Sequence, residues 1–351
     1  MKGLSLSFKI IEPMMFRGSG EFDPFVKGAH SRASSLLLPT PSTIAGSLAT
    51  YCISQLSKQM PTMQYWIEEY LSVLGNDVKI RGPVLSANNS IFVEDRCLHT
   101  FLSLEELKKK CRIEYEKFKE VKSLAELDEY FKLESFKPIV KKMRKDIRVG
   151  VGLQLREKEN VKIAREGLLY SAEYLNYESF KSNKECKYSE SSIEILVDVK
   201  GSLVNELLEK SPIPIKLGGE TRISLMEFRE GNRIFDEVKS TLWCNKEEHN
   251  GILALYLATP ALFKGGKRVV EYVKDWVNKM GYKFKGIIGE SEALGAGYSF
   301  NKRKRKPIYT SLKPGSIIYL DGEFDLQNIY WNASIGEATS IGYGTIFATP
   351  L

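Results

Sequence analysis

The chain has 351 residues, of which 43% are hydrophobic and 27% are charged, so a disordered polypeptide is excluded. This length predicts about two domains, each able to bury a core without disulfide staples. Lys and Arg outnumber Asp and Glu by 51 to 44, and this excess is too small to define a binding partner by itself.

The five cysteines have an odd count and no CxxC spacing, so they indicate neither a disulfide framework nor a zinc site and favour a reducing, cytoplasmic compartment. Residues 1–13 alternate between apolar and polar, so they predict a strand and not a signal peptide. The longest uncharged run, residues 33–57, contains two prolines, and its helical part is too short to span a bilayer. We therefore expect no membrane segment.

The first elements follow from hydrophobic periodicity. Residues 4–10 alternate and predict a half-buried strand. Residues 12–41 form a long loop rich in Gly, Ser and Pro, and Ser42 is the expected N-cap of a buried helix. Apolar residues step by three or four over residues 104–131, which is typical of an amphipathic helix. Residues 137–148 are expected to continue it, so a helical insertion is predicted at about residues 102–148.

The rest of the first half predicts strands at 167–177 and 192–199, a short helix at 203–210, and a glycine turn leading into a strand within 213–229. The resulting order of strand, helix, strand, strand, helix, strand is that of the ferredoxin-like fold.

The second half follows a similar outline, with strands at 251–259, 282–288, 317–320 and 341–347 and a helix at 266–280. We expect an α+β protein made of two ferredoxin-like (RRM-like) units with a helical insertion and glycine-rich loops. The units are predicted over residues 1–245 and 246–351.

Residues for metal-dependent or nucleophilic catalysis are scattered. His30, His99 and His249 are far apart, and the acidic alternation at residues 321–325 is typical of a solvated turn. The chain contains no GxxxxGK[ST], GxSxG or HExxH motif. We expect no metal, no cofactor and no hydrolase of a familiar type.

The long first loop carries Arg17, His30 and Arg32. His30 could act as a general base on a ribose hydroxyl. It could also stack on a base or bind a phosphate, or simply anchor its own loop. The residues alone leave these three roles open.

Three glycine-rich segments lie beside cations. The first has Gly286, Gly289, Gly295 and Gly297, followed by Tyr298 and by Lys302, Arg303, Lys304, Arg305 and Lys306. The second has Gly218 and Gly219 followed by Arg222, and the third has Gly265 and Gly266 followed by Lys267 and Arg268 at a helix start. Glycines let phosphates approach the backbone, aromatic rings stack on bases, and cations neutralise phosphates, so nucleic acid is the expected partner. Five phosphate contacts on a single strand would give a salt slope of about −3.5.

Several motifs occur in a characteristic order along the chain. They are IEP at 11–13, FR at 16–17, LPTPSTIAG at 38–46, AREGLLY at 164–170, AEYL at 172–175, LGGETR at 217–222, KPGSIIY at 313–319 and IGYG at 341–344. This ordered set resembles the third subunit of the Cmr (type III-B) CRISPR effector complex, a family of the RAMP superfamily.

The resemblance implies a non-catalytic subunit for antiviral defence. It would hold the 5′ handle of the CRISPR RNA and lie beside a Cas10-type large subunit and the RAMP backbone subunits. It implies RNA-binding roles for Arg17, His30, Arg32, Arg165, Gly218, Gly219, Arg222 and the glycine-rich loop with residues 302–306. Tyr298 stands where family members often have a tryptophan.

Two other functions are open at this stage. Some RAMP relatives are metal-independent endoribonucleases that trim CRISPR transcripts, and His30 would then be the general base, although no general acid is evident near it. A protein scaffold that touches no RNA is the third hypothesis. Its assembly should be almost insensitive to salt, whereas RNA binding should weaken steeply as salt rises.

Overall fold

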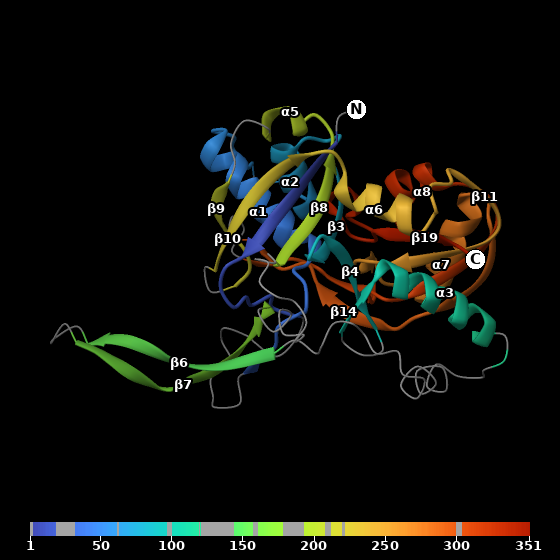
Figure 1. Cartoon of the computed structure of the whole chain (residues 1–351). Coiled ribbons are helices and arrows are strands. Elements are labelled where there is room, and N and C mark those ends of the chain that lie inside the picture. The colour runs from blue at the N-terminus through green and yellow to red at the C-terminus, as the bar shows by residue number, and fades with distance from the viewer. Residues whose placement is uncertain are drawn as a thin grey trace.

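The computed structural model describes residues 3–18, 32–61, 63–96, 100–118, 120, 144–156, 161–177, 193–207, 212–219, 222–299 and 304–351, and all structural statements concern these residues. It shows an α+β protein built mainly from antiparallel sheets (Figure 1).

A seven-stranded antiparallel sheet organises the first half. Its strands lie in the order β5 (Thr100–Ser103), β4 (Ser90–Asp95), β3 (Lys79–Ala87), β8 (Ile193–Lys200), β1 (Leu4–Ile10), β10 (Ile223–Glu230) and β9 (Ile213–Lys216). The predicted strand β1 is present, but Ser5 and Ser7 are buried as well as its apolar residues. The expectation of a half-buried strand was wrong because β1 lies inside the sheet with both faces covered. The Ser5 hydroxyl is accommodated there by donating to Asp198 at 2.7 Å.

Helices α1 (Pro41–Gln55), α2 (Trp66–Leu74) and α5 (Val204–Leu207) share one hydrophobic core with β1, β3 and β8. The N-cap of α1 is Thr40 and not Ser42, because Pro41 occupies the first helical position, where its fixed φ and missing N–H fit. The Ser42 hydroxyl instead lies 3.0 Å from the Tyr343 hydroxyl, a hydrogen bond between distant parts of the chain.

The predicted helical insertion is only partly helical. Helix α3 (Leu104–Phe118) follows β5 directly, and its Leu107 and Cys111 are fully buried in the second hydrophobic core. Glu114 on α3 accepts a buried hydrogen bond of 3.0 Å from Arg96. Helix α3 is therefore part of the folded body and not an added segment.

The expected helix at 137–148 is wrong from residue 144 onward, and residues 121–143 lie outside the described residues. Arg144–Arg156 form strand β6, which pairs antiparallel with β7 (Val161–Asn176), while β2 (Arg32–Ala33) runs parallel to β7. Ile147 and Val149 give this segment a period of two, and pairing along β7 outweighs the helical bias of its basic residues. The β6–β7 hairpin projects from the body (Figure 1).

The second half contains a four-stranded antiparallel sheet in the order β13 (Lys283–Ile288), β18 (Ile317–Asp325), β11 (Glu248–Leu257) and β19 (Ile346–Pro350). Helix α7 (Val269–Lys279) lies between β11 and β13 in sequence, and α8 (Leu326–Asn332) lies between β18 and β19. A small three-stranded sheet has the order β12 (Ala261–Phe263), β17 (Ile308–Leu312) and β14 (Ser291–Gly295). A two-stranded sheet pairs β15 (Tyr298–Ser299) with β16 (Lys304–Arg305). Helix α6 (Arg233–Thr241) precedes this half.

The strand expected at 341–347 begins only at Ile346. A short 3₁₀ turn (Thr339–Ile341) and glycines with positive φ, Gly342 at 107° and Gly344 at 64°, come first. A Cβ on Gly344 would lie 1.9 Å from the Ile335 carbonyl oxygen. The IGYG motif is therefore a tightly packed turn that admits glycine alone at this position.

The two halves lie side by side (Figure 1), and residues of both halves belong to one hydrophobic core. The second hydrophobic core combines Val84 and Leu196 of the seven-stranded sheet with Leu255 of the four-stranded sheet and with α3 and α6. Buried Arg81 on β3 also reaches across, donating to the carbonyl oxygens of Tyr330 (2.8 Å) and Trp331 in the last turn of α8. These carbonyls lie at the negative end of the helix dipole, which stabilises the buried guanidinium.

Candidate nucleic-acid interface

The first loop, strand β7 and the Gly218-Gly219 turn meet at the base of the β6–β7 hairpin. Met14 and Leu175 exchange two backbone hydrogen bonds of 2.7 and 3.0 Å, and the Gly219 amide donates to the Met15 carbonyl at 2.9 Å. Segments separated by more than 150 residues in the sequence are thus joined through their backbones.

The glycines of this turn serve close packing of the chain. Gly218 has a φ of 83°, and a Cβ there would lie 2.6 Å from the Met15 carbonyl oxygen. The sequence analysis predicts that this glycine pair lets a phosphate approach the backbone. The contact with Met15 gives the pair a structural role, and a phosphate contact at this turn stays a prediction.

Arg222 follows the turn and is engaged within the protein. Its guanidinium forms an ion pair with Glu12, which also accepts a 2.8 Å hydrogen bond from the Ile223 amide. The amide hydrogen bond and Arg222 together lower the pKa of Glu12. The Arg222 guanidinium also lies 4.7 Å from the centre of the Tyr174 ring.

The structure places the other first-half candidates around the same strands. Arg17 is exposed and forms a β-bridge with Ser35, which follows β2 in the chain. Arg32 lies in β2, opposite Ser171 of β7, and Arg165 lies further along β7. His30 lies outside the described residues, so its role stays a prediction.

The C-terminal glycine-rich segment is closely packed at its start and open at its end. A Cβ on Gly295 or Gly297 would meet nothing within 4 Å, whereas one on Gly286 or Gly289 would contact Phe118 or Ser316 closely. Tyr298 in β15 pairs with Arg305 in β16. Only the end of the loop near residues 295–297 therefore leaves space beside its backbone.

The basic run does not act as five equivalent cations. Lys306 is buried, and its ammonium donates to the Tyr70 hydroxyl at 2.6 Å and lies 5.1 Å from the centre of the Trp66 ring. The expectation that it meets a phosphate is wrong because its charge is held by aromatic groups of α2. Arg305 is exposed, Lys304 lies in β16, and Lys302 and Arg303 lie outside the described residues.

Lys267 and Arg268 lie at the start of α7. Lys267 forms a 2.8 Å ion pair with Asp275, which raises the pKa of the lysine, while Arg268 is the more exposed of the two at 86% of its side chain. Gly265 and Gly266 have open space at their Cβ positions. An anion at this helix start stays a prediction.

Sequence reasoning missed Glu12, Arg148 and Tyr174. Arg148 on β6 lies with its guanidinium carbon 4.6 Å from the centre of the Tyr174 ring, the same ring that Arg222 contacts. Tyr174 belongs to the AEYL motif and could have been noticed there. Arg148 had no such signal, because it was assigned to a helix.

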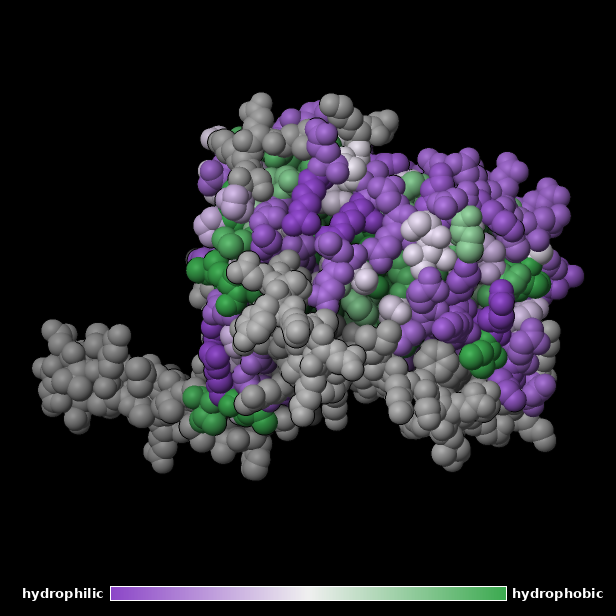
Figure 2. All heavy atoms as spheres, in the orientation of Figure 1, coloured by the Kyte–Doolittle hydropathy of each residue, from purple (hydrophilic) through white to green (hydrophobic). Residues whose placement is uncertain are grey.

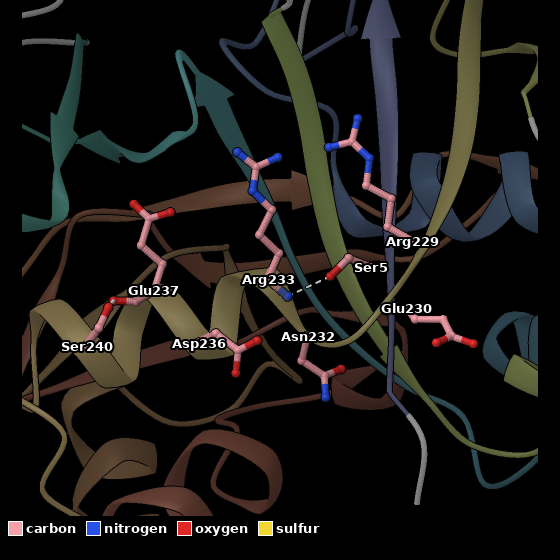
Figure 3. A pocket seen from close by; sticks show the side chains of 8 residues that line it. All are labelled: Ser5, Arg229, Glu230, Asn232, Arg233, Asp236, Glu237 and Ser240. Atoms are coloured by element: carbon pink, nitrogen blue, oxygen red, sulfur yellow. Dashed lines mark hydrogen bonds between the residues drawn. The ribbon is translucent and has the colours of Figure 1, made fainter.

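A pocket of about 460 Å³ lies at the other end of β10 (Figure 3). It is lined by Ser5, Arg229, Glu230, Asn232, Arg233, Asp236, Glu237 and Ser240. Arg229 and Arg233 both form ion pairs with Glu194, and Arg229 also pairs with Glu227, so both cations of this pocket have carboxylate partners. The pocket lies at the end of β10 that is remote from Arg222, so it is separate from the hairpin base.

Within the described ranges, no group of three or more His, Cys, Asp or Glu residues could hold a metal ion. None of the helices in that part of the chain is long and apolar enough to cross a membrane. Hydrophilic residues cover most of the described surface in the view of Figure 2, with smaller hydrophobic groups between them.

The antiparallel sheets and the projecting hairpin define the class of this chain as an α+β protein (Figure 1). The chain resembles one in the cryo-EM structure of the type III-B Cmr-beta complex bound to cognate target RNA, with a TM-score of 0.62, 19% identity and coverage of 97% of this chain and 96% of that chain. A structure of the same complex with cognate target RNA and AMPPnP gives a TM-score of 0.61 and 18% identity, with coverage of 98% and 95%.

Two sequence comparisons define the family. The chain is 26% identical over 318 residues to the CRISPR system CMR subunit Cmr3 of Saccharolobus solfataricus, covering 88% of this chain and 84% of that protein. The family model described as CRISPR-associated protein (Cas_Cmr3) matches residues 93–351, so the chain belongs to this family of type III-B Cmr effector subunits. The resemblance drawn from the motifs is confirmed.

Proposed function

We propose that the chain is a non-catalytic RNA-binding subunit that holds the 5′ handle of the CRISPR RNA and contacts a Cas10-type large subunit. The observation that supports this best is the meeting of three family motifs at the hairpin base. The first loop, β7 and the LGGETR turn are joined there by the hydrogen bonds of Met14 and Gly219. These contacts hold motif residues that are far apart in the sequence close together at the hairpin base, which supports a shared binding role for them.

We propose further that each half is a ferredoxin-like unit, with a boundary near residue 246. Four strands of the first sheet lie in the spatial order β10-β1-β8-β3, and the second sheet has the order β13-β18-β11-β19. In each set, the two central strands are the first and the third in chain order, namely β1 and β8, and β11 and β18. This arrangement is the ferredoxin-like one. The pairings of the seven-stranded sheet end at Glu230, and those of the four-stranded sheet begin at Glu248.

The insertion predicted at about residues 102–148 should pack against the first domain or contact another subunit. Because its helix α3 packs in the body, a contact with the large subunit is left to the rest of the insertion. We assign it to residues 121–143, which lie outside the described residues. A chain lacking them should fold and lose co-purification with the large subunit. Unchanged co-purification would contradict this assignment.

The RNA proposal is tested by competition between the correct handle and a scrambled RNA on the assembled complex. Arg17→Ala and Arg32→Ala should each cost about 1.5–3 kcal/mol of binding, as expected for a lost charged hydrogen bond. His30→Ala should lower discrimination between the two RNAs more than total affinity. Arg112→Ala is the matched control, because Arg112 is exposed on α3, far along the chain from these motifs.

If the three variants bind and discriminate like the parent, the first loop does not hold the handle. The endoribonuclease alternative is tested separately. The purified chain with magnesium or manganese should not cut RNA. A co-purifying cleavage that disappears in His30→Ala would replace the proposed function by that alternative.

A further inference from the structure

Two arginines from different strands share one tyrosine at the hairpin base. The guanidinium carbons of Arg148 on β6 and Arg222 beside β10 lie 4.6 and 4.7 Å from the centre of the Tyr174 ring. Tyr174 is buried and packs with Met15 and Ala172 in a small hydrophobic cluster. Because the ring is fixed by that packing, it can hold both guanidinium groups in place.

The two arginines differ in what else they contact. Arg222 is paired with Glu12, whose second oxygen accepts from the Ile223 amide. This arrangement ties the start of the first loop to the start of β10 and leaves the pair with no net charge. Arg222 is therefore a positioning residue.

Arg148 is exposed, and its charge adds to the amide hydrogen bond and the charge of Arg222 in lowering the pKa of Glu12, the carboxylate that Arg222 already pairs with. Arg148 lies opposite Ala172 in the register of the hairpin, whereas Glu173 lies opposite Ile147 and accepts the ion pair of Lys145 at 2.7 Å. A guanidinium that lies on a ring keeps its N–H donors in its own plane, where they can grip a phosphate with two parallel hydrogen bonds.

The two faces of β6 are chemically distinct at this point. Side chains alternate along a strand, so Ile147 and Val149 face away from Arg148 and Tyr174. Both are largely exposed and apolar, and they offer nothing to an anion. Lys145 shares the face of Ile147 and Val149 but is paired with Glu173. An RNA backbone that crosses the base of the hairpin would therefore find its phosphate ligand on the Arg148 face.

We propose that Arg148, held on Tyr174, binds a backbone phosphate of single-stranded RNA. The ligand is a phosphodiester, and the contact carries no base specificity. This inference rests on the proposed RNA-binding function and adds a residue that neither the motifs nor the basic runs indicated.

The test uses the full-length chain and a fluorescein-labelled single-stranded RNA, with affinity measured by anisotropy over a range of KCl concentrations. Arg148→Ala should bind about ten-fold more weakly, and its salt slope should be flatter by about 0.7, the value for one lost phosphate contact. Arg148→Lys should keep the slope but lose affinity, because lysine keeps the charge without the planar pair of donors. Arg112→Ala is the control and should change neither quantity.

Thermal unfolding of each variant separates binding from folding. If Arg148→Ala lowers the melting temperature, Arg148→Lys carries the test, and parent-like affinity in that variant overturns the inference. A parent that binds this RNA, together with an unchanged slope in Arg148→Ala, also overturns it and leaves the RNA-binding function intact. A parent that does not bind RNA, with a slope near zero, refutes the proposed function and the inference with it.

Discussion

Replacing Lys306 by methionine separates a structural lysine from an RNA-binding one. Lys306 is 9% exposed, its ammonium donates to the Tyr70 hydroxyl, and it lies 4.5 Å from the centre of the Tyr70 ring. Burial lowers the pKa of Lys306 to about 8. Methionine has a similar length and fills the same space without a charge.

The magnitude follows from this pKa. A lysine that titrates at about 8 in the folded chain and at about 10.5 when unfolded carries about 3 kcal/mol of preference for its neutral form. Between these pH values the unfolded chain binds more protons than the folded one, so the free energy of unfolding rises with pH. Lys306 should add about 1.4 kcal/mol to the stability at about pH 9 relative to about pH 7.

The assay is urea unfolding followed by tryptophan fluorescence for the parent and Lys306→Met, at about pH 7 and about pH 9. The parent should gain more stability on going to high pH than the variant does, by the amount above. Lys267→Met is the matched control, because Lys267 is exposed and stays charged over this range in both states. Parallel pH profiles for the parent and Lys306→Met would refute the reasoning, and so would a flatter RNA salt slope in Lys306→Met.

Three further predictions concern the core, a turn and the basic run. Arg81→Met should lower the free energy of unfolding by about 3–5 kcal/mol, because it strips the carbonyls of α8 of their buried donor; a loss below about 1 kcal/mol in urea unfolding would contradict this. Gly344→Ala should abolish soluble expression, since its Cβ would overlap a carbonyl oxygen, whereas Gly266→Ala, at positive φ but in open space, should cost only about 1 kcal/mol; equal effects would contradict the packing argument. Alanine at residues 302–305 should flatten the RNA salt slope by up to about 2.8, and an unaltered slope would show that these cations face solvent.

The sequence predicted elements that are set by local periodicity. Strand β1 and helix α7 were expected from alternation and from a step of three to four residues, and both are present. Strand β6 was missed because Lys and Arg around residue 145 resemble a helix face, while its partner β7 decides its conformation. Long-range pairing of this kind is invisible to a local pattern.

The candidate site was predictable only as a set of motifs. The order of the motifs identified the family. The motifs include Arg222 and Tyr174, but the sequence does not show that these two side chains are in contact. The burial of Lys306 could not be predicted, because it depends on Tyr70, 236 residues away in the chain. Charge in a run of basic residues therefore says little about which members reach solvent.

The shared core of the two halves has a consequence for synthesis on the ribosome. The last strand, β19, pairs with β11 and completes the sheet that covers Val84 and Leu196 of the first half. At about 5–20 residues per second, a chain of this length leaves that apolar face uncovered for about 5–20 s after the first half has been made. During this interval the nascent chain exposes an apolar, aggregation-prone surface. Binding of a chaperone or of a partner subunit should therefore protect the first half more than the second.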